Sequence, residues 1–436
     1  MKVLMKADAC KFKKEGGANL KYIDLFAGAG GLSEGFIRAG FEAVAHIEMN
    51  PEASKTLKTR LAYWHLNKNN DLNHYYKYLR GKISRDDLYA LIPDNLLSTV
   101  LNYTMNNKNL KDIFELIDSR LGDNRHIDLI VGGPPCQAYS LVGRAKQRRR
   151  EEIALEKGEK YEDDPRKYLY RLYCQFLKYY KPDMFVFENV PGLLSADSGR
   201  HWQDIQNMLR KAGYEIQHKE LNAKTFGVPQ ERKRIIIIGW KKKSQHFFPE
   251  FEAIEPTWTV ADVLADLPSI QAGEQSSKYR RVKIHPYVAC HLRTTADVLT
   301  WHVARSHIER DREIYRLAIH KWLDGNKHKR LHYLDIPENL RTHKNLTDFA
   351  DRFKVVAPDI PYCHTMLAHI SKDGHYFIHP DSTQARSLSV REAARIQTFP
   401  DNYFFEGSRT SVFTQIGNAV PPLMAERIAE ELRKQL

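Results

Sequence analysis

The sequence lacks the features that mark membrane, secreted and disulfide-stapled proteins. No run of apolar residues approaches the roughly 18 that a membrane-spanning helix needs. Residues 1–20 are polar and charged, so no secretory signal is expected. The 436 residues include five cysteines and no C-x-x-C pair, which argues against a disulfide framework and against a four-cysteine zinc site.

The chain carries an excess of positive charge. Lysine and arginine total 67 against 54 aspartates and glutamates, and the net charge is +13. Such a balance favours a polyanionic partner, for example nucleic acid. Hydrophobic residues make up 42% and aromatic residues 11%, so the chain is expected to fold around a sizeable core. The length allows more than one domain.

Strand candidates alternate with helical patterns through the first half of the chain. The strand candidates lie at 22–26, 43–48, 127–131, 184–188 and 235–239. This alternation predicts an α/β fold with a parallel sheet. Residues 55–125 are expected to form helical insertions within it.

The pattern changes after residue 243. From 244 to 385 the alternation is lost, and most of the 19 histidines fall between residues 285 and 379. The segment predicts a second, basic domain. Its adjacent Cys-His pairs at 290–291 and 363–364 do not have metal-ligand spacing, so no metal site is predicted. Helical spacing returns at 390–397.

The segment DLFAGAGGL at 24–32 runs from a strand candidate through a Gly-rich turn into a helix. Such a turn holds nucleotide-type cofactors on helix N-terminal amides. The dinucleotide fingerprint requires glycine at position 33, where this chain has Ser33, so a pyrophosphate is less favoured. Glu48 ends the next strand candidate, where a carboxylate can accept both hydroxyls of a ribose. A glycine turn without a ligand is the alternative.

The segment GGPPCQ at 132–137 follows the strand candidate at 127–131. Parallel sheets place their active sites beyond the carboxyl ends of strands. A thiol on a turn stiffened by glycine and proline can serve as a nucleophile, so Cys136 is a candidate. A chemically inert small cysteine is the alternative.

Two charged motifs border later strand candidates. In ENVPG at 188–192, Glu188 follows four apolar residues and is either bonded to the backbone or functional. In QERKR at 230–234, Arg232 and Arg234 alternate, so an extended segment points both to one side. They are either donors for a carbonyl or phosphate, or part of a solvated charge run.

The segment RAKQRRR at 144–150 follows Cys136 closely and carries five basic residues in seven. A basic loop beside a nucleophile suits phosphate contacts that close a site, and a solvated loop is the alternative. The basic residues are Arg144, Lys146, Arg148, Arg149 and Arg150.

In this order the motifs resemble those of the DNA (cytosine-5)-methyltransferase family, a group of class I S-adenosylmethionine-dependent methyltransferases. RSLSVREAARIQTFPD at 386–401 and QIGNAVPP at 415–422 complete the set, which extends over almost the whole chain. The resemblance implies a Rossmann-like S-adenosylmethionine-binding domain formed by 1–243 and 386–436. It also implies a smaller target-recognition domain at 244–385.

The resemblance further implies roles for single residues. Cys136 would attack C6 of a flipped-out cytosine, Glu188 would bond to the ring, and Arg232 would hold its O2, with Arg234 as the weaker assignment. Glu48 would hold the ribose of S-adenosylmethionine. The implied cofactor contacts are Phe26, Gly28, Gly30, Gly31, Leu32, Glu48, Met49, Pro134, Asn418 and Val420.

One family element has no assigned counterpart, namely a Gly-Asp-Ile-like segment whose carboxylate meets the adenine amino group. The nearest match, Gly81-Lys82-Ile83, has lysine in place of the acid. Asp86 and Asp87 are the nearby substitutes.

The implied substrate is cytosine in a specific sequence of double-stranded DNA, within a restriction–modification system that can include a cognate endonuclease. We expect a monomer in the cytoplasm, associated with the nucleoid and not with a membrane. An RNA (tRNA) cytosine-5 methyltransferase of the same family is the main alternative, and the basic segment 244–385 favours DNA. An inactive DNA-binding relative conflicts with intact Cys136, Glu188 and Arg232. A nicotinamide oxidoreductase conflicts with Ser33.

Overall fold

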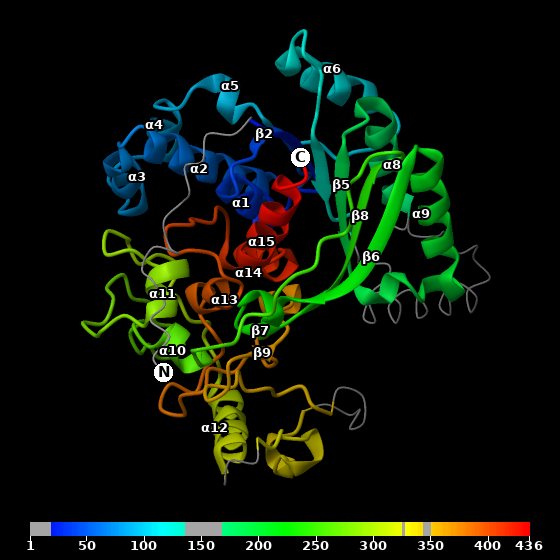
Figure 1. The fold of residues 1–436 in the computed structure, drawn as a ribbon. Coiled ribbons are helices and arrows are strands. Elements are labelled where there is room, and N and C mark those ends of the chain that lie inside the picture. The colour runs from blue at the N-terminus through cyan, green and yellow to red at the C-terminus, as the bar shows by residue number, and fades with distance from the viewer. Residues whose placement is uncertain (1–18, 136–167, 325–327, 343–349) are drawn as a thin grey trace, which may run out of the picture.

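The computed structural model describes residues 19–135, 168–324, 328–342 and 350–436. Its centre is a seven-stranded sheet of order β3-β2-β1-β4-β5-β8-β6 (Figure 1). The strands are β1 (Lys21–Leu25), β2 (Glu42–Ile47), β3 (Val100–Leu101), β4 (Leu129–Gly132), β5 (Met184–Asn189), β6 (Tyr214–Asn222) and β8 (Lys233–Lys241). The predicted α/β class is confirmed, and every strand candidate is present.

Strands β1 to β5 run parallel, and β8 lies antiparallel to both β5 and β6. Because β1 lies between β2 and β4, the strand order reverses beside it. In sheets of this kind, ligands bind at such a reversal, just beyond the carboxyl ends of the strands. The predicted motifs at residues 26, 48, 132 and 188 all lie at that edge.

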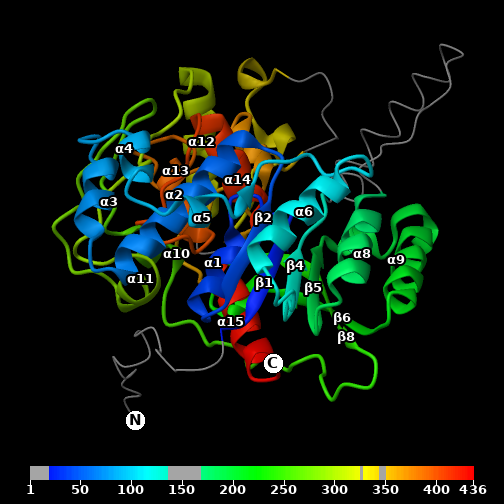
Figure 2. The same cartoon turned by 90° about the horizontal axis from the view of Figure 1, so that it is seen from above.

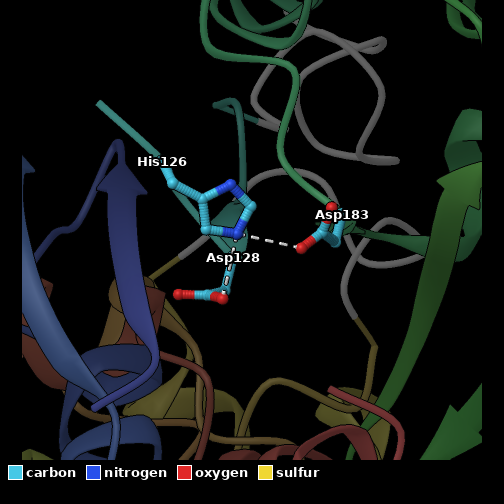
Figure 3. A group of neighbouring side chains, drawn as sticks. All are labelled: His126, Asp128 and Asp183. Carbon is cyan, nitrogen blue, oxygen red and sulfur yellow. Dashed lines mark ion pairs between the residues drawn. The ribbon is translucent and has the colours of Figure 1, made fainter. Parts of the chain in front are cut away.

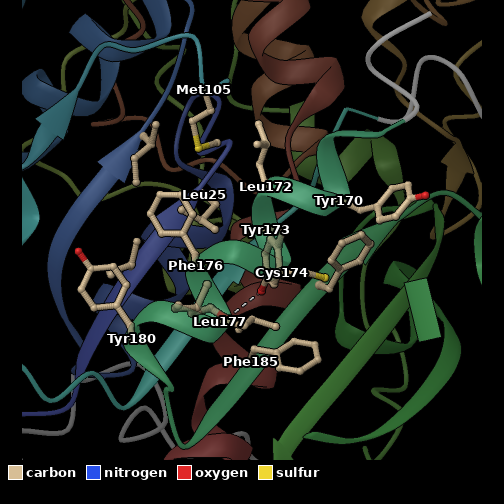
Figure 4. Packing of buried hydrophobic residues seen from close by; sticks show 14 of the residues in the cluster. Leu25, Met105, Tyr170, Leu172, Tyr173, Cys174, Phe176, Leu177, Tyr180 and Phe185 are labelled. Carbon is tan, nitrogen blue, oxygen red and sulfur yellow. Dashed lines mark hydrogen bonds between the residues drawn. The ribbon is translucent and has the colours of Figure 1, made fainter. Parts of the chain in front are cut away.

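Helices cover both faces of the sheet (Figure 2). One face carries α1 (Gly31–Arg38) and α15 (Pro422–Arg433), and the other carries α6 (Leu110–Leu121), α8 (Leu169–Tyr180) and α9 (Arg200–Lys211). Figure 4 shows the buried residues of α8, among them Tyr173 and Phe176, packed on the sheet. On the opposite face, Gly35 permits close contact between α1 and α15, since a Cβ there would lie 2.5 Å from the Cβ of Ala425.

The connection from β2 to β3 is helical, as expected for the insertion. It contains α2 (Pro51–Lys68), α3 (Leu72–Leu79), α4 (Arg85–Tyr89) and α5 (Asp94–Leu97), which bury a cluster of their own. Tyrosines of α3 reach later parts of the chain. The hydroxyl of Tyr76 donates to Asp297 over 3.1 Å, and that of Tyr78 donates to Glu406 over 2.7 Å.

The segment 244–385 holds α10 (Val260–Leu264), α11 (Pro286–His291), α12 (Glu309–Leu323) and β9 (Cys363–His364). β9 pairs in parallel with β7 (Gln230–Glu231). One buried cluster surrounds α12. A second joins α10 and α11 to α13 (Val390–Ile396) and α14 (Arg409–Asn418), so this segment shares a core with the C-terminal part of the chain.

Short 3₁₀ helices complete the described structure. They are Pro191–Leu193, Ala196–Gly199, Ala223–Phe226, Tyr333–Asp335, Glu338–Leu340 and Ala368–Ser371. Within the described ranges, no helix combines the length and the apolar character needed to cross a membrane.

A buried ionic cluster joins the shared core. Arg395 of α13 is fully buried, and its Nη2 lies 2.6 Å from Oδ2 of Asp401. Its other Nη contacts Asp266, which follows α10. Asp266 also pairs with Arg293 at 2.6 Å. Because the charges of 266, 395 and 401 are withdrawn from water, each depends on the others for compensation.

We expect Arg395→Met to lower the free energy of unfolding by about 3–5 kcal/mol, because it leaves two buried carboxylates without their shared partner. Urea denaturation measures the change. Lys434→Met is the matched control, since Lys434 and Glu431 form an ion pair on the surface, and its loss should cost less than about 1 kcal/mol. Equal effects of the two substitutions would contradict a structural role for the buried cluster.

Candidate active site

The Gly-rich turn, residues 26–30, connects β1 to α1. Phe26, Gly28 and Gly30 have φ angles of 59°, 57° and 81°, all in the left-handed region. Position 30 favours glycine for two reasons. Its φ angle lies in the left-handed region, and a Cβ there would lie 2.6 Å from the Leu57 side chain. A Cβ at Gly28 would meet nothing within 4 Å. Side chains therefore fill the space next to Gly30, whereas the space next to Gly28 is open, so a ligand can approach the backbone there.

Glu48 lies beside this turn at the carboxyl end of β2. Its Oε2 accepts a hydrogen bond from Gly28 N over 2.8 Å, and its Oε1 accepts one from Asn50 N over 2.7 Å. Burial raises the pKa of Glu48, while these backbone donors act in the opposite direction. Each oxygen of an ionised carboxylate has a second acceptor position, so Glu48 can bind the turn and a diol together. Met49, next in the chain, is 59% exposed.

Asn102 is a residue that the sequence analysis missed. It directly follows β3, and its Nδ2 donates to the carbonyl oxygen of Glu48 over 2.8 Å and to that of Met49 over 3.1 Å. It therefore lies at the carboxyl end of β3, the strand that pairs with β2. Asp87, one of the suggested substitutes, instead accepts a hydrogen bond from Ser84 N at the start of α4.

The turn after β4 lies against the end of β5. A Cβ at Gly133 would lie 2.5 Å from Oε2 of Glu188, so a larger residue there would displace the Glu188 carboxylate. Asn189 Nδ2 donates to the carbonyl oxygen of Pro134 over 3.1 Å. Cys136 and the basic residues Arg144, Lys146, Arg148, Arg149 and Arg150 lie outside the described residues.

Glu188 is paired with Arg234. The Nε of Arg234, in β8, lies 2.7 Å from Oε1 of Glu188, and the two side chains are only 10% and 13% exposed. A carboxylate and a guanidinium side by side offer acceptor and donor atoms next to each other. Such a pair suits the edge of a flat polar ring.

Arg232 makes different contacts. This residue is fully buried, and its Nη1 donates to the carbonyl oxygen of Met366 over 2.6 Å. Its Nη2 donates to that of Gly417 over 3.2 Å. The structure thus brings Arg234 to Glu188 and places Arg232 between the segment that follows β9 and the end of α14. Alternation along the sequence does not distinguish the two arginines.

The last motif reaches the Gly-rich turn, as its place in the predicted site requires. A Cβ at Gly31 would lie 2.1 Å from the carbonyl oxygen of Val420, so this segment is packed directly on the start of α1. Asn418 is exposed at the end of α14. The hydroxyl of Tyr403, which the sequence analysis did not select, donates to the carbonyl oxygen of Ala29 over 2.5 Å.

A buried polar group lies behind the turn. Ser33 Oγ donates to Oδ2 of Asp24 over 2.5 Å and lies 2.9 Å from Nδ1 of His46. Burial raises the pKa of Asp24 to about 7 and lowers the pKa of His46 to about 4. Tyr22 and Glu48 also face Asp24, and both are acidic groups. The sequence shows Asp24 and Ser33 only as parts of a motif and gives no sign of His46.

A possible metal-ligand set lies at the opposite edge of the sheet (Figure 3). His126 Nε2 is 3.2 Å from Asp128 Oδ1 and 3.1 Å from Asp183 Oδ2. Asp183 also pairs with Lys241 at 2.7 Å, and His126 is half exposed. Ion pairing accounts for this cluster, which lies at the amino ends of β4 and β5, away from the carboxyl edge.

Comparison of the sequence with family models gives a match to the C-5 cytosine-specific DNA methylase over residues 20–88 and 94–434. The type II methyltransferase M.Bpa9945I of Bacillus paralicheniformis is 41% identical, over 94% of this chain and 98% of that protein. The type II methyltransferase M1.HphI of Haemophilus parahaemolyticus is 31% identical, over 95% of this chain and 87% of that protein.

Solved structures match the whole fold. A structure assigned as a DNA modification methyltransferase encoded within an Escherichia coli prophage has a TM-score of 0.61 and 23% identity, and covers 95% of this chain and 99% of its own. A methyltransferase of Entamoeba histolytica has a TM-score of 0.51 and 16% identity, over 96% and 99%. At these identities the likeness establishes the Rossmann-like fold.

The substitution Asp24→Asn tests the cost of burying this carboxyl group. Its pKa of about 7 lies above the ordinary value of 3.8, so between these values the folded protein binds a proton that the unfolded chain has released. The unfolding free energy of the unsubstituted protein should therefore fall, relative to the variant, by up to about 4 kcal/mol between pH 4 and pH 7. Urea unfolding at several pH values measures the difference, and a difference independent of pH would count against it.

Proposed function

The chain belongs to the family of C-5 cytosine-specific DNA methylases and is a DNA (cytosine-5) methyltransferase, and from this premise we propose how its residues act. One observation carries the proposal. The Gly-rich turn, Glu48 and the Glu188–Arg234 pair come together at the carboxyl edge of one sheet, although they lie on different strands. That edge is where a methyl donor and a base can meet.

The methyl donor is S-adenosylmethionine, which supplies an electrophilic methyl group on a sulfonium. The residues present fit it, because the space beside Gly28 is open and Glu48 is a nearly buried acceptor next to that space. Glu48 would accept the ribose hydroxyls while it holds Gly28 N. Phe26, Gly30, Gly31 and Leu32 shape the turn. Pro134, Asn418 and Val420 would border it from the other two motifs.

The adenine would lie beyond Glu48. Met49 is largely exposed there, so its side chain offers an apolar surface to a ring. Asn102 is held next to it through its Nδ2, and its Oδ1 can accept a hydrogen bond from an exocyclic amino group. We favour Asn102 over Asp86 and Asp87 for this contact, because those acids belong to α4 of the helical insertion.

The target cytosine would bind at the Glu188–Arg234 pair. Glu188 would bond to the N3 edge of the ring and Arg234 to O2, so that charge developing on the ring meets fixed polar groups. The sequence analysis assigns the contact with O2 to Arg232. Its contacts with Met366 and Gly417 favour a positioning role instead, in which it ties the segment after β9 to the end of α14.

Cys136 is the proposed nucleophile. Its thiolate would form a bond to C6 of the flipped-out base, and the electron pair displaced to C5 would attack the methyl group, whose bond to sulfur breaks. Loss of the C5 proton to a base then re-forms the ring double bond and expels the thiolate. Two other thiols are unsuited to this step, because burial raises the pKa of Cys174 and of Cys363 to about 12.

Target recognition is assigned to residues 244–385, set between the catalytic parts 1–243 and 386–436. A cavity of about 140 Å³ supports this role. It lies beside β9, and its lining includes Lys329, Arg330 and Lys354 together with Trp322 and Phe353, a combination that suits phosphates and bases. The basic residues at 144–150 would contact DNA phosphates. The type II relatives suggest a restriction–modification system with a cognate endonuclease.

Trapping the covalent intermediate tests the nucleophile. Fluorine at C5 permits attack and methyl transfer but cannot leave as a proton, so the adduct persists. Duplex DNA with 5-fluorocytosine at the target, together with S-adenosylmethionine, should give a complex that survives denaturing electrophoresis. Cys136→Ser should give none, because a hydroxyl is a far weaker nucleophile than a thiolate.

Cys174→Ala and Cys363→Ala are the controls and should keep the adduct. An adduct in Cys136→Ser would overturn the assignment of the nucleophile. The same assay with fluorinated RNA addresses the RNA alternative, and trapping on RNA alone would overturn the proposed substrate.

A pair of substitutions separates the two arginines. Arg234→Met should lower the kcat of the folded protein by about 10²–10³-fold, because a group that stabilises charge in the transition state is lost. It should also lower the urea midpoint, because the nearly buried Glu188 loses its partner. Arg232→Met should lower the urea midpoint, because the carbonyl oxygens of Met366 and Gly417 lose their donor. A larger loss of kcat in folded Arg232→Met than in folded Arg234→Met would restore the sequence-based assignment of O2 to Arg232.

A further inference from the structure

Ser33 directly follows the first motif, and the proposed site does not use it. It stands at the position of the third glycine of the dinucleotide fingerprint, which allows a helix to approach its strand closely. Here the residue has a hydroxyl, and the side chain is turned inward, with only 2% of the residue exposed. The hydroxyl is therefore available to the protein interior and not to a ligand on the surface.

The partners of this hydroxyl belong to two neighbouring strands. Asp24 lies in β1 and His46 in β2, and the two residues are paired in the sheet register. Both are fully buried. Ser33 Oγ lies 2.5 Å from Asp24 and 2.9 Å from His46, so the start of α1 is bonded to two strands at once.

We propose that Asp24, Ser33 and His46 are positioning residues that hold the Gly-rich turn in the shape that binds S-adenosylmethionine. The inference rests on the proposed role of the turn. Asp24 and Ser33 flank the turn, so their hydrogen bond closes its base and fixes the separation of its two ends. Ser33 also fixes how deeply α1 sits on the sheet, and with it the position of the backbone amides that face the ligand.

The turn needs such a support. Three of its five residues are in the left-handed region, and one of them, Phe26, has a side chain, which makes that conformation costly. Gly30 occupies the N-cap position of α1 and provides no side-chain cap. The first amides of the helix are thus left for a ligand and do not themselves stabilise the turn. A hydrogen bond behind the turn supplies the missing constraint without occupying the ligand side.

Selection for stability alone would not favour a buried carboxyl group at position 24. A fully buried carboxyl group whose pKa is raised to about 7 costs free energy when it ionises, and Oδ1 of Asp24 has no hydrogen-bond partner within the described ranges. If the contact served stability alone, Asp24→Asn at pH 8 would leave cofactor binding unchanged. If the contact positions the turn, the variant should be more stable than the unsubstituted protein and yet bind the cofactor less tightly.

The experiment measures steady-state methylation with saturating target DNA and varied S-adenosylmethionine, with calorimetric binding of S-adenosylhomocysteine alongside. Ser33→Ala should raise KM for S-adenosylmethionine about tenfold, as expected for the loss of a buried hydrogen bond to a charged group, with kcat unchanged within about twofold. Asp24→Asn keeps one acceptor oxygen for Ser33, so its KM should rise less. Tyr173→Phe is the matched control, because it removes an equally buried hydroxyl that bonds to β4 and β5 and should leave KM unchanged.

Several outcomes would overturn the inference. These are an unchanged KM in folded Ser33→Ala, a loss confined to kcat, or a rise in KM equal to that of Tyr173→Phe. If Ser33→Ala does not fold, Asp24→Asn decides, and unchanged cofactor affinity at pH 8 rejects the proposal. Failure of the unsubstituted protein to methylate DNA with S-adenosylmethionine would instead reject the proposed function, and with it the premise of this inference.

Discussion

The Gly-rich turn depends on contacts from parts of the chain that are distant in sequence. Its left-handed residues are unfavourable in isolation, and the conformation persists because the surroundings determine it. Glu48 holds the amide of Gly28, and the hydroxyl of Tyr403 holds the carbonyl group of Ala29. The start of α1 is pressed against the carbonyl oxygen of Val420. The proposed donor site thus depends on the whole fold, and the residues proposed for it come from the first and last motifs together.

Buried guanidinium groups hold together segments of the chain that are distant in the sequence. Arg232 donates to backbone carbonyl oxygens of two segments that are far apart in the sequence. Arg391 does the same for Thr300, Pro400 and Tyr403. A planar group with five N–H donors can satisfy several carbonyl oxygens at once where irregular segments meet without a strand ladder. The segment 244–385, which has little regular structure, is anchored to the C-terminal part of the chain in this manner.

Local sequence patterns predict five of the seven strands of the central sheet and the motifs at strand ends, and they miss β3 and β6. The strands near 22–26 and 184–188 are predicted because apolar runs bounded by turn residues define them. β3 is not predicted, since two residues show no periodicity, and Asn102 is missed with it. Alternation places Arg232 and Arg234 on one side but cannot say which of them reaches Glu188. The contact of Tyr403 with Ala29 spans 374 positions, and no local pattern encodes it.

The ionic cluster around Arg395 also bears on how chains of this architecture can recombine during evolution. Asp266 and its second partner Arg293 lie within the segment that precedes α12, yet Asp266 compensates the charge of Arg395 on α13. A crossover near residue 244 would import a foreign segment and leave Arg395 without one of its two carboxylates. A crossover beyond residue 293 would retain the complete cluster. Heritable exchange of the segment that we propose for target recognition is therefore easiest when its first breakpoint falls between α11 and α12.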